Sequence, residues 1–159
     1  MKKFLLFFAL FTCCINCFSQ SEEYLRDYFE KNAGSLDQIE GIYDVETTGD
    51  YITPFVHYKY HKDNITFYIV KNGSEYDVYG KGEAPLVKCN MKIIPIAGNA
   101  YRFKYHTSYA RMYLENRNHF VATIELDYET AKRFTENSRL AESVRIILKY
   151  DAIKTYPNN

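Results

Sequence analysis

Apolar and polar residues alternate with a period of two through most of the chain between residues 52 and 126. This alternation predicts half-buried β-strands, because successive side chains of a strand point to opposite faces. Glycine, proline and asparagine interrupt the alternation at short intervals, and Asn72-Gly73 and Gly98-Asn99 are strong signals for tight hairpin turns. The chain is therefore expected to fold as an antiparallel β-meander.

The expected strands follow from where each alternating run begins and ends. The first covers 41–47 and is followed by a turn at Gly49-Asp50, and another runs from 87 to the turn at Gly98-Asn99. The remaining runs predict strands at about 52–61, 65–71, 75–80, 101–106, 109–114, 119–126 and 143–154.

Two segments show helical spacing instead. In residues 21–33 the apolar side chains recur one turn apart, and Gly34 follows where a helix is expected to end. Asp127 is a suitable N-cap for a second helix over about 128–139, with Ala131 and Phe134 on its inner side. One helix thus precedes the strands and one precedes the last strand.

A meander of this many short strands is expected to close on itself, because closure removes the exposed edges of the sheet. We predict a mainly β fold, an antiparallel up-and-down β-barrel of about eight or nine strands. The chain contains no internal repeat and no linker, so residues 20–159 are expected to form a single domain.

The segment Gly41-Ile42-Tyr43 opens the first expected strand. Together with the order of the elements, it resembles the lipocalin-like (calycin) group, whose first strand carries Gly-x-Trp. The resemblance spans most of residues 20–159 and implies a barrel with a ligand in its interior. Tyr replaces Trp here, and the sequence shows no evident counterpart of the arginine that stacks on that Trp, nor of the group's Thr-Asp-Tyr loop.

Residues 1–19 are typical of a signal peptide. Lys2 and Lys3 precede an apolar run of about eleven residues, too short for a bilayer core that needs roughly 20. Cleavage is expected between Ser19 and Gln20, which predicts export to the periplasm or secretion from a bacterium. No later apolar stretch approaches the length of a membrane span.

Lipid anchoring is the alternative outcome of the same signal. Cys13 and Cys17 each occupy a place where a lipid could be attached, although neither is preceded by the small residues of a bacterial lipobox. With the signal removed, 18 basic and 20 acidic residues remain, and this near-neutral balance gives no reason to expect a nucleic-acid partner.

No familiar catalytic or metal-binding motif occurs in the sequence after the signal. His57 and His61 lie four residues apart on one expected strand, about 13 Å, too far to share one metal ion. His106 and His119 fall on outward positions. We therefore expect neither a metal site nor a bound cofactor.

Cys89 is the remaining thiol, and it lies on the apolar face of a strand, where burial would make it unreactive. Two pairs of carboxylates lie close in sequence, Glu125 with Asp127 and Asp44 with Glu46. Each is more simply read as solvent-facing strand residues, so no catalytic residue is assigned and the protein is expected not to be an enzyme.

Tyrosine is the unusual residue of this chain, with 16 copies and no tryptophan. Buried hydroxyls need hydrogen-bonding partners, so many inward tyrosines indicate either a wet cavity or rings near the ends of a filled barrel. The inward tyrosines are expected to include Tyr76. The candidate ligand-binding residues are Tyr43, Tyr58, Tyr60, Tyr101, Phe103, Tyr105 and Tyr150.

The leading hypothesis is an exported β-barrel that binds a small hydrophobic or amphipathic molecule in a Tyr-lined interior. The alternative is an extracytoplasmic structural or protein-interaction module with a filled barrel and no ligand. Such a module would dock a partner protein through an outer face exposing Phe55, Tyr68, Val70 and Val121.

Overall fold

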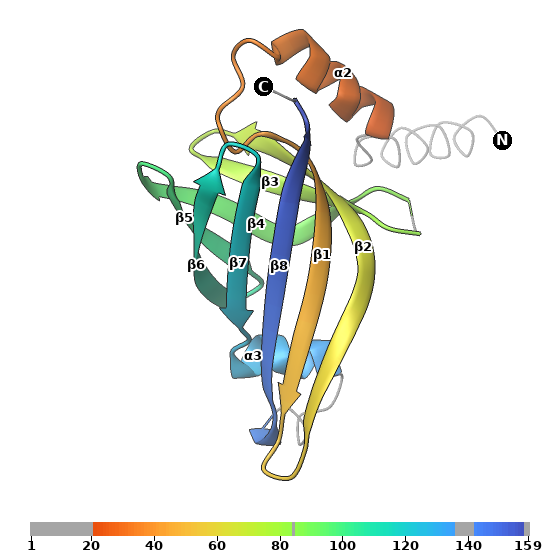
Figure 1. The fold of residues 1–159 in the computed structure, drawn as a ribbon, viewed down its shortest axis with the longest axis vertical. Coiled ribbons are helices and arrows are strands. Elements are labelled where there is room, and N and C mark those ends of the chain that lie inside the picture. Colours follow the sequence, from red (N-terminus) through yellow and green to blue (C-terminus); the bar gives the residue numbers. More distant parts are fainter. Residues whose placement is uncertain (1–20, 84, 136–141, 158–159) are drawn as a thin grey trace, which may run out of the picture.

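The computed structural model describes residues 21–83, 85–135 and 142–157, with the backbone alone described at 60–63, 134 and 135. Its strands form one closed antiparallel barrel, in which β1 to β8 are neighbours in chain order and β8 pairs back with β1 (Figure 1). The signal peptide expected at 1–19 lies outside the described residues.

Among the described residues, helix α2 (Glu22–Asn32) precedes β1 and helix α3 (Tyr128–Thr135) follows β7, before β8. Four strands form the first half of the meander: β1 (Gly41–Ile52), β2 (His57–Asn72), β3 (Glu75–Lys81) and β4 (Val87–Ala97). The others are β5 (Ala100–Tyr105), β6 (Ser108–Asn116), β7 (His119–Glu125) and β8 (Arg145–Tyr156). The predicted mainly β barrel and both helices are thus confirmed, and 136–139 of the second helix lie outside the described residues.

The turn predicted at Gly49-Asp50 is wrong. β1 continues through both residues to Ile52, and the chain reverses at 53–56, where Thr53 Oγ1 accepts hydrogen bonds from the backbone amides two and three residues later. Gly49 is a buried strand residue paired with Leu148. Glycine at this position therefore reflects close packing inside the barrel and not a turn.

The two strands predicted at 52–61 and 65–71 are a single strand, β2. Between the pairs Val45–Ile65 and Thr47–Lys62 the register of β1 and β2 shifts, because β2 holds one extra residue there; this irregularity accounts for the break in alternation that suggested two strands. Pro54 and Val56, which belong to the strand predicted at 52–61, both lie exposed in the turn. This fusion explains why the barrel has eight strands.

Tight turns close the β2–β3 and β4–β5 hairpins as predicted. Gly73 and Gly98 have φ angles of 64° and 56°, in the left-handed region that glycine adopts without steric cost. They join β2 to β3 and β4 to β5. Asp127 caps α3 as predicted, accepting a hydrogen bond from the backbone amide of Thr130 at 2.8 Å.

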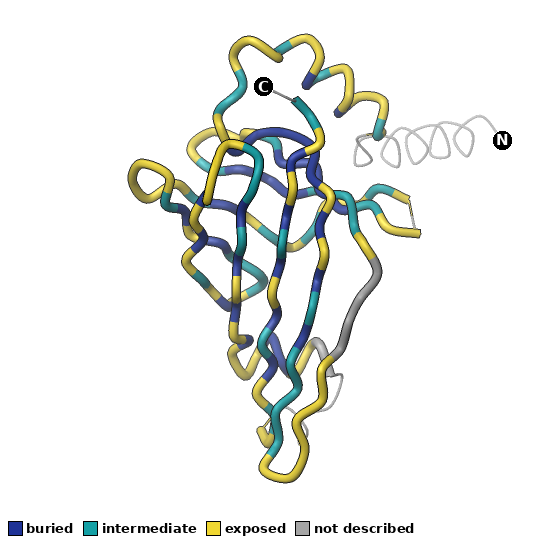
Figure 2. The backbone as a smooth tube through the Cα atoms, in the orientation of Figure 1, coloured by how far each residue is buried: buried dark blue, intermediate teal, exposed yellow. Residues whose placement is uncertain are grey.

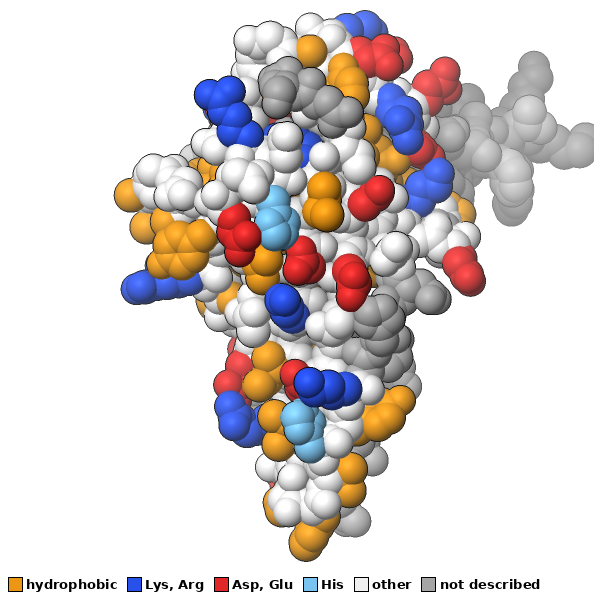
Figure 3. Space-filling model, viewed as in Figure 1, with side chains coloured by type: hydrophobic (Ala, Val, Ile, Leu, Met, Phe, Trp, Pro, Cys, Tyr) orange, Lys and Arg blue, Asp and Glu red, His pale blue; other side chains and the backbone are white. Residues whose placement is uncertain are grey.

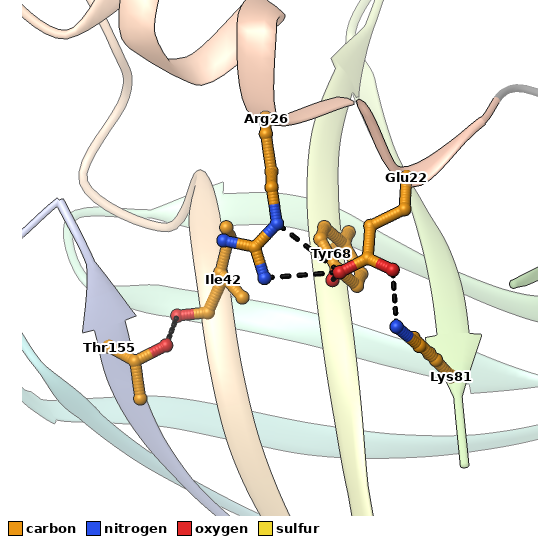
Figure 4. Close-up of polar contacts among 6 residues, drawn as sticks. All are labelled: Glu22, Arg26, Ile42, Tyr68, Lys81 and Thr155. Carbon is orange, nitrogen blue, oxygen red and sulfur yellow. Dashed lines mark hydrogen bonds and ion pairs between the residues drawn. The ribbon is translucent and has the colours of Figure 1, made fainter. Parts of the chain in front are cut away.

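Helix α2 lies against the outside of the barrel at its upper end, next to the C-terminus (Figure 1). Ser21 caps it, and Leu25 and Phe29 are fully buried against Ile42 and Tyr68. Glu22 then holds the helix to the strands by accepting hydrogen bonds from Tyr68 Oη and Lys81 Nζ (Figure 4).

This packing corrects one expectation about the outer face. Tyr68 is fully buried and Val70 is half-buried beneath α2, whereas Phe55 is 94% exposed at the tip of the β1–β2 hairpin. Tyr68 is therefore not available on the face proposed for partner docking, because the N-terminal helix covers it.

Candidate functional site

The lower half of the barrel contains a cavity of about 800 Å³. It lies between β1, β2, β4 and β8, and the loop between β3 and β4 borders it. At this end Figure 1 shows the tip of the β1–β2 hairpin and helix α3. Figure 2 shows mostly exposed and half-buried positions at this end, and buried positions alternating with exposed ones along the strands above it.

Apolar side chains from several strands form most of the cavity wall. Ile65 and Phe67 come from β2, and Val87, Cys89 and Met91 come from alternate positions of β4. The alternation of these strands is what aims the side chains inward together. The wall therefore offers apolar surface that a partly apolar molecule could bury.

Two tyrosines add hydroxyl groups to this wall. Tyr105 and Tyr150 both line the cavity, and burial raises the pKa of each phenol above its usual value. Tyr150 also packs on Phe103 and Phe67, with ring centroids 5.2 and 6.1 Å apart. Tyr150 thus separates the cavity from the packed core above it.

Small inward residues leave the space open. Thr47, Gly49 and Gly80 occupy inward strand positions in the lower half, where larger side chains would fill an eight-stranded barrel. A Cβ atom on Gly80 would lie 2.7 Å from Cys89 Sγ, so a larger residue at this position would have to displace the thiol.

Thr47 also carries a polar atom without a partner. Thr47 is 6% exposed. Among the described residues, its Oγ1 is the one buried side-chain nitrogen or oxygen atom without a hydrogen-bond partner. Such a group costs about 1–3 kcal/mol. Rotation to another staggered χ1 position would move the hydroxyl to a new direction, and because Thr47 lines the cavity, this wall position can present a hydroxyl to it.

The upper end of the barrel, in contrast, is closed by residues 37–40. Ile39 is fully buried in the core, and its carbonyl accepts a hydrogen bond from Tyr43 Oη at 2.9 Å. Tyr76 Oη donates to Asp37 Oδ2 at 2.8 Å. These two tyrosines are thus satisfied by the closing segment, without a cavity.

Lys154 of β8 binds residues 37–40 through hydrogen bonds and so stabilises the closed end. Its Nζ donates to the carbonyl oxygens of Gln38 and Glu40 at 2.6 and 2.9 Å and lies 5.3 Å from the centre of the Tyr43 ring. Burial lowers the pKa of Lys154 to about 8. The Glu40 carboxylate is itself buried and accepts hydrogen bonds from Tyr28 Oη and the Lys71 amide.

The predicted ligand-binding residues divide between these two regions. Tyr105 and Tyr150 line the cavity, whereas Tyr43, Tyr101 and Phe103 lie in the packed core above it. The register sets Tyr58 opposite Tyr51 at the lower end, but there it is 60% exposed and not inside the barrel. The side chain of Tyr60 lies outside the described residues.

Sequence reasoning missed the aliphatic part of the wall. Ile65, Met91 and Leu148 line the cavity but are not among the predicted ligand-binding residues. Only the small residues Gly49 and Gly80 could have indicated a space beside them. Cys89 was expected to be buried in the core, but it is partly exposed in the cavity wall and forms no disulfide with a described residue.

The other candidate groups have structural partners. His57 lies 2.8 Å from Asp50, and Arg145 binds both oxygens of Glu125. His106, predicted to face outward, borders the cavity. Asp127 caps α3 and Glu125 binds Arg145, so both carboxylates of this candidate pair have structural roles.

Within the described ranges, no three His, Cys, Asp or Glu side chains come together as a metal site would require. The helices described, α2 and α3 among them, are all too short or too polar to cross a membrane. Comparison of the chain with protein-family models, with curated proteins and with solved structures finds no match.

Proposed function

We propose that this protein is an exported, non-enzymatic β-barrel that binds a small, partly apolar ligand in its lower half. The observation that carries the proposal is the cavity of about 800 Å³ between Phe67, Met91, Tyr105 and Tyr150. Pockets that bind small molecules are typically about 300–1,000 Å³ and mostly apolar, with a few polar groups.

Binding would come mainly from burying the apolar part of the ligand against Ile65, Met91 and Leu148. The hydroxyls of Tyr105 and Tyr150 would fix its orientation, because both belong to the wall and both phenols stay protonated at neutral pH. Thr47 offers a further hydroxyl after a change of rotamer. The ligand should therefore carry at least one hydrogen-bonding group on an otherwise apolar body.

We also propose a lipocalin-like architecture. The eight-stranded barrel and Gly41-Ile42-Tyr43 at the start of β1 support it. The sequence suggested no counterpart of the group's stacking arginine, but Lys154 of the last strand lies over the Tyr43 ring and supplies a cation at that place. Export rests on the apolar run and basic start of residues 1–19.

The direct test is native mass spectrometry of the protein purified from its natural source. A co-purifying small molecule that dissociates from the folded barrel is the expected result. A mass that equals the polypeptide alone, in repeated preparations, would contradict the proposal and favour a structural or interaction module. The same spectrum tests export, since removal of residues 1–19 changes the polypeptide mass.

A variant pair then places the ligand. The fluorescent apolar probe N-phenyl-1-naphthylamine should bind the protein, and Cys89→Phe should abolish that binding because the new ring projects into the cavity. Cys89→Ala is the matched control, since it removes the same thiol and leaves the space open. Equal binding by the two variants would place the probe elsewhere and count against the cavity.

A further inference from the structure

The outer face of the β5–β6 hairpin carries a group of basic and aromatic residues. Tyr101 and Phe103 of β5 point into the core, so the alternate residues Arg102 and Lys104 point outward. On β6, exposed positions alternate with the buried Met112 and Leu114. We call the following residues the β5–β6 basic face: Arg102, Lys104, Tyr109, Arg111 and Tyr113.

The strand register sets like charges directly opposite one another on this face. Arg102 of β5 pairs with Arg111 of β6, and on the other side Lys104 pairs with Lys92 of β4. Like charges in directly opposite positions destabilise a sheet. Folding alone therefore gives no reason for this arrangement.

The three cations of the β5–β6 basic face also lack acidic partners. Several other outward cations of the barrel lie beside carboxylates, for example Lys88 at 2.6 Å from Asp77 and Lys92 at 2.6 Å from Glu75. Within the described part of the chain, Arg102, Lys104 and Arg111 have no carboxylate oxygen within 4.0 Å. Their charge is available to an external anion.

Tyrosine rings lie among these charges. Arg102 and Lys104 both lie over the ring of Tyr109, at 5.8 and 5.4 Å from its centre. Tyr109 and Tyr113 are each about half exposed, and with Ile96 they line a shallow hollow of about 460 Å³. Figure 3 shows hydrophobic and basic side chains side by side along the left edge of the molecule, where β5 and β6 lie in Figure 1.

We propose that the β5–β6 basic face binds an acidic polysaccharide. The guanidinium groups of Arg102 and Arg111 suit the planar carboxylates of sugar acids, which they can bind through two hydrogen bonds. The exposed tyrosine rings offer flat apolar surfaces on which a sugar ring can pack. A hollow of this size can receive one sugar ring of a polysaccharide chain. A bilayer surface, in contrast, would suit a flat or convex protein face.

The test measures binding of the full-length protein to polygalacturonate at low salt, with uncharged dextran as the reference polymer. Arg102→Gln with Arg111→Gln should weaken binding by about tenfold or more, because two charged contacts are lost. The control variant, Lys59→Gln with Arg117→Gln, removes the same charge from positions elsewhere on the barrel and should bind within about twofold of the original protein.

Thermal unfolding of the same variants separates a binding role from a structural one. The R102Q/R111Q variant should be as stable as the original protein or more stable, since the like-charge pair is gone. Lower stability in that variant would overturn the proposal. So would absence of polygalacturonate binding, equal losses in both double variants, or equally tight binding to phosphatidylglycerol vesicles or to duplex DNA.

Discussion

The two halves of the barrel share the same eight strands and the same alternation, yet one is filled and the other is hollow. In the upper half the aromatic rings of Tyr43 and Phe120 pack at 5.2 Å, and residues 37–40 close the end. In the lower half the inward positions include Thr47, Gly49 and Gly80, and a cavity of about 800 Å³ remains.

This difference teaches that side-chain size decides what an eight-stranded barrel can do. Such a barrel is just wide enough for its side chains to fill it, so each small inward residue leaves space that a ligand can occupy. The tyrosine hydroxyls follow the same division. Tyr43 and Tyr76 bond to the closing segment, whereas Tyr105 and Tyr150 belong to the cavity wall.

The largest expected contrast comes from truncating one isoleucine in each half. Ile93→Ala removes a fully buried side chain from the filled half and should lower the free energy of unfolding by about 2–5 kcal/mol. Ile65→Ala acts on the cavity wall, where atoms already border empty space, and should cost less than half as much. Urea denaturation measures both, and equal losses would break the distinction between the halves.

Enlarging one valine in each half gives the opposite test. Val78→Phe should destabilise by about 1–3 kcal/mol, because the fully buried site has no room for a ring. Val87→Phe lies in the cavity wall, 58% exposed, and should be tolerated while weakening binding of the naphthylamine probe. A large loss of stability in V87F would show that the lower half is as tightly packed as the upper.

A smaller effect is expected from pH at the closed end. Lys154 has a pKa lowered to about 8 when folded, against the usual value of 10.5 when unfolded. Between these values the unfolded chain holds more protons, so stability should rise with pH from 8 toward 10 by about 1–2 kcal/mol. Comparing the original protein with Lys154→Met isolates this contribution, because other titrating groups cancel; a parallel pH dependence of both would contradict it.

Most of the fold could be predicted from the sequence, because alternation and turn residues report local structure. The hairpins at Gly73 and Gly98 and the cap at Asp127 were all evident in this way. The turn predicted at Gly49-Asp50 was wrong, since glycine in a strand and glycine in a turn look alike in the sequence. Pairing of Gly49 and Asp50 with β8 makes both of them strand residues.

The site was predictable only in part. The inward direction of Tyr105 and Tyr150 followed from strand phase, but phase does not tell how far along the barrel a residue lies. Tyr43 and Tyr101 share that phase and lie in the packed half. Which end is hollow depends on the segment 37–40 folding across the other end, a long-range arrangement that no local pattern encodes.

Thiol labelling tests the central claim, a hollow lower half beneath a filled upper half, most directly. Cys89 lies in the cavity wall. In a Cys89→Ala background, Val45→Cys places a thiol in the filled half, where Val45 is fully buried and the cysteine side chain is similar in size to the valine that it replaces. Alkylation of the folded proteins by iodoacetamide can be followed by mass spectrometry of the peptide around each site. We predict that Cys89 reacts without denaturant and is protected by the bound naphthylamine probe, while the thiol introduced by Val45→Cys reacts only after unfolding. Equal protection of both thiols in the folded, probe-free proteins would contradict the account.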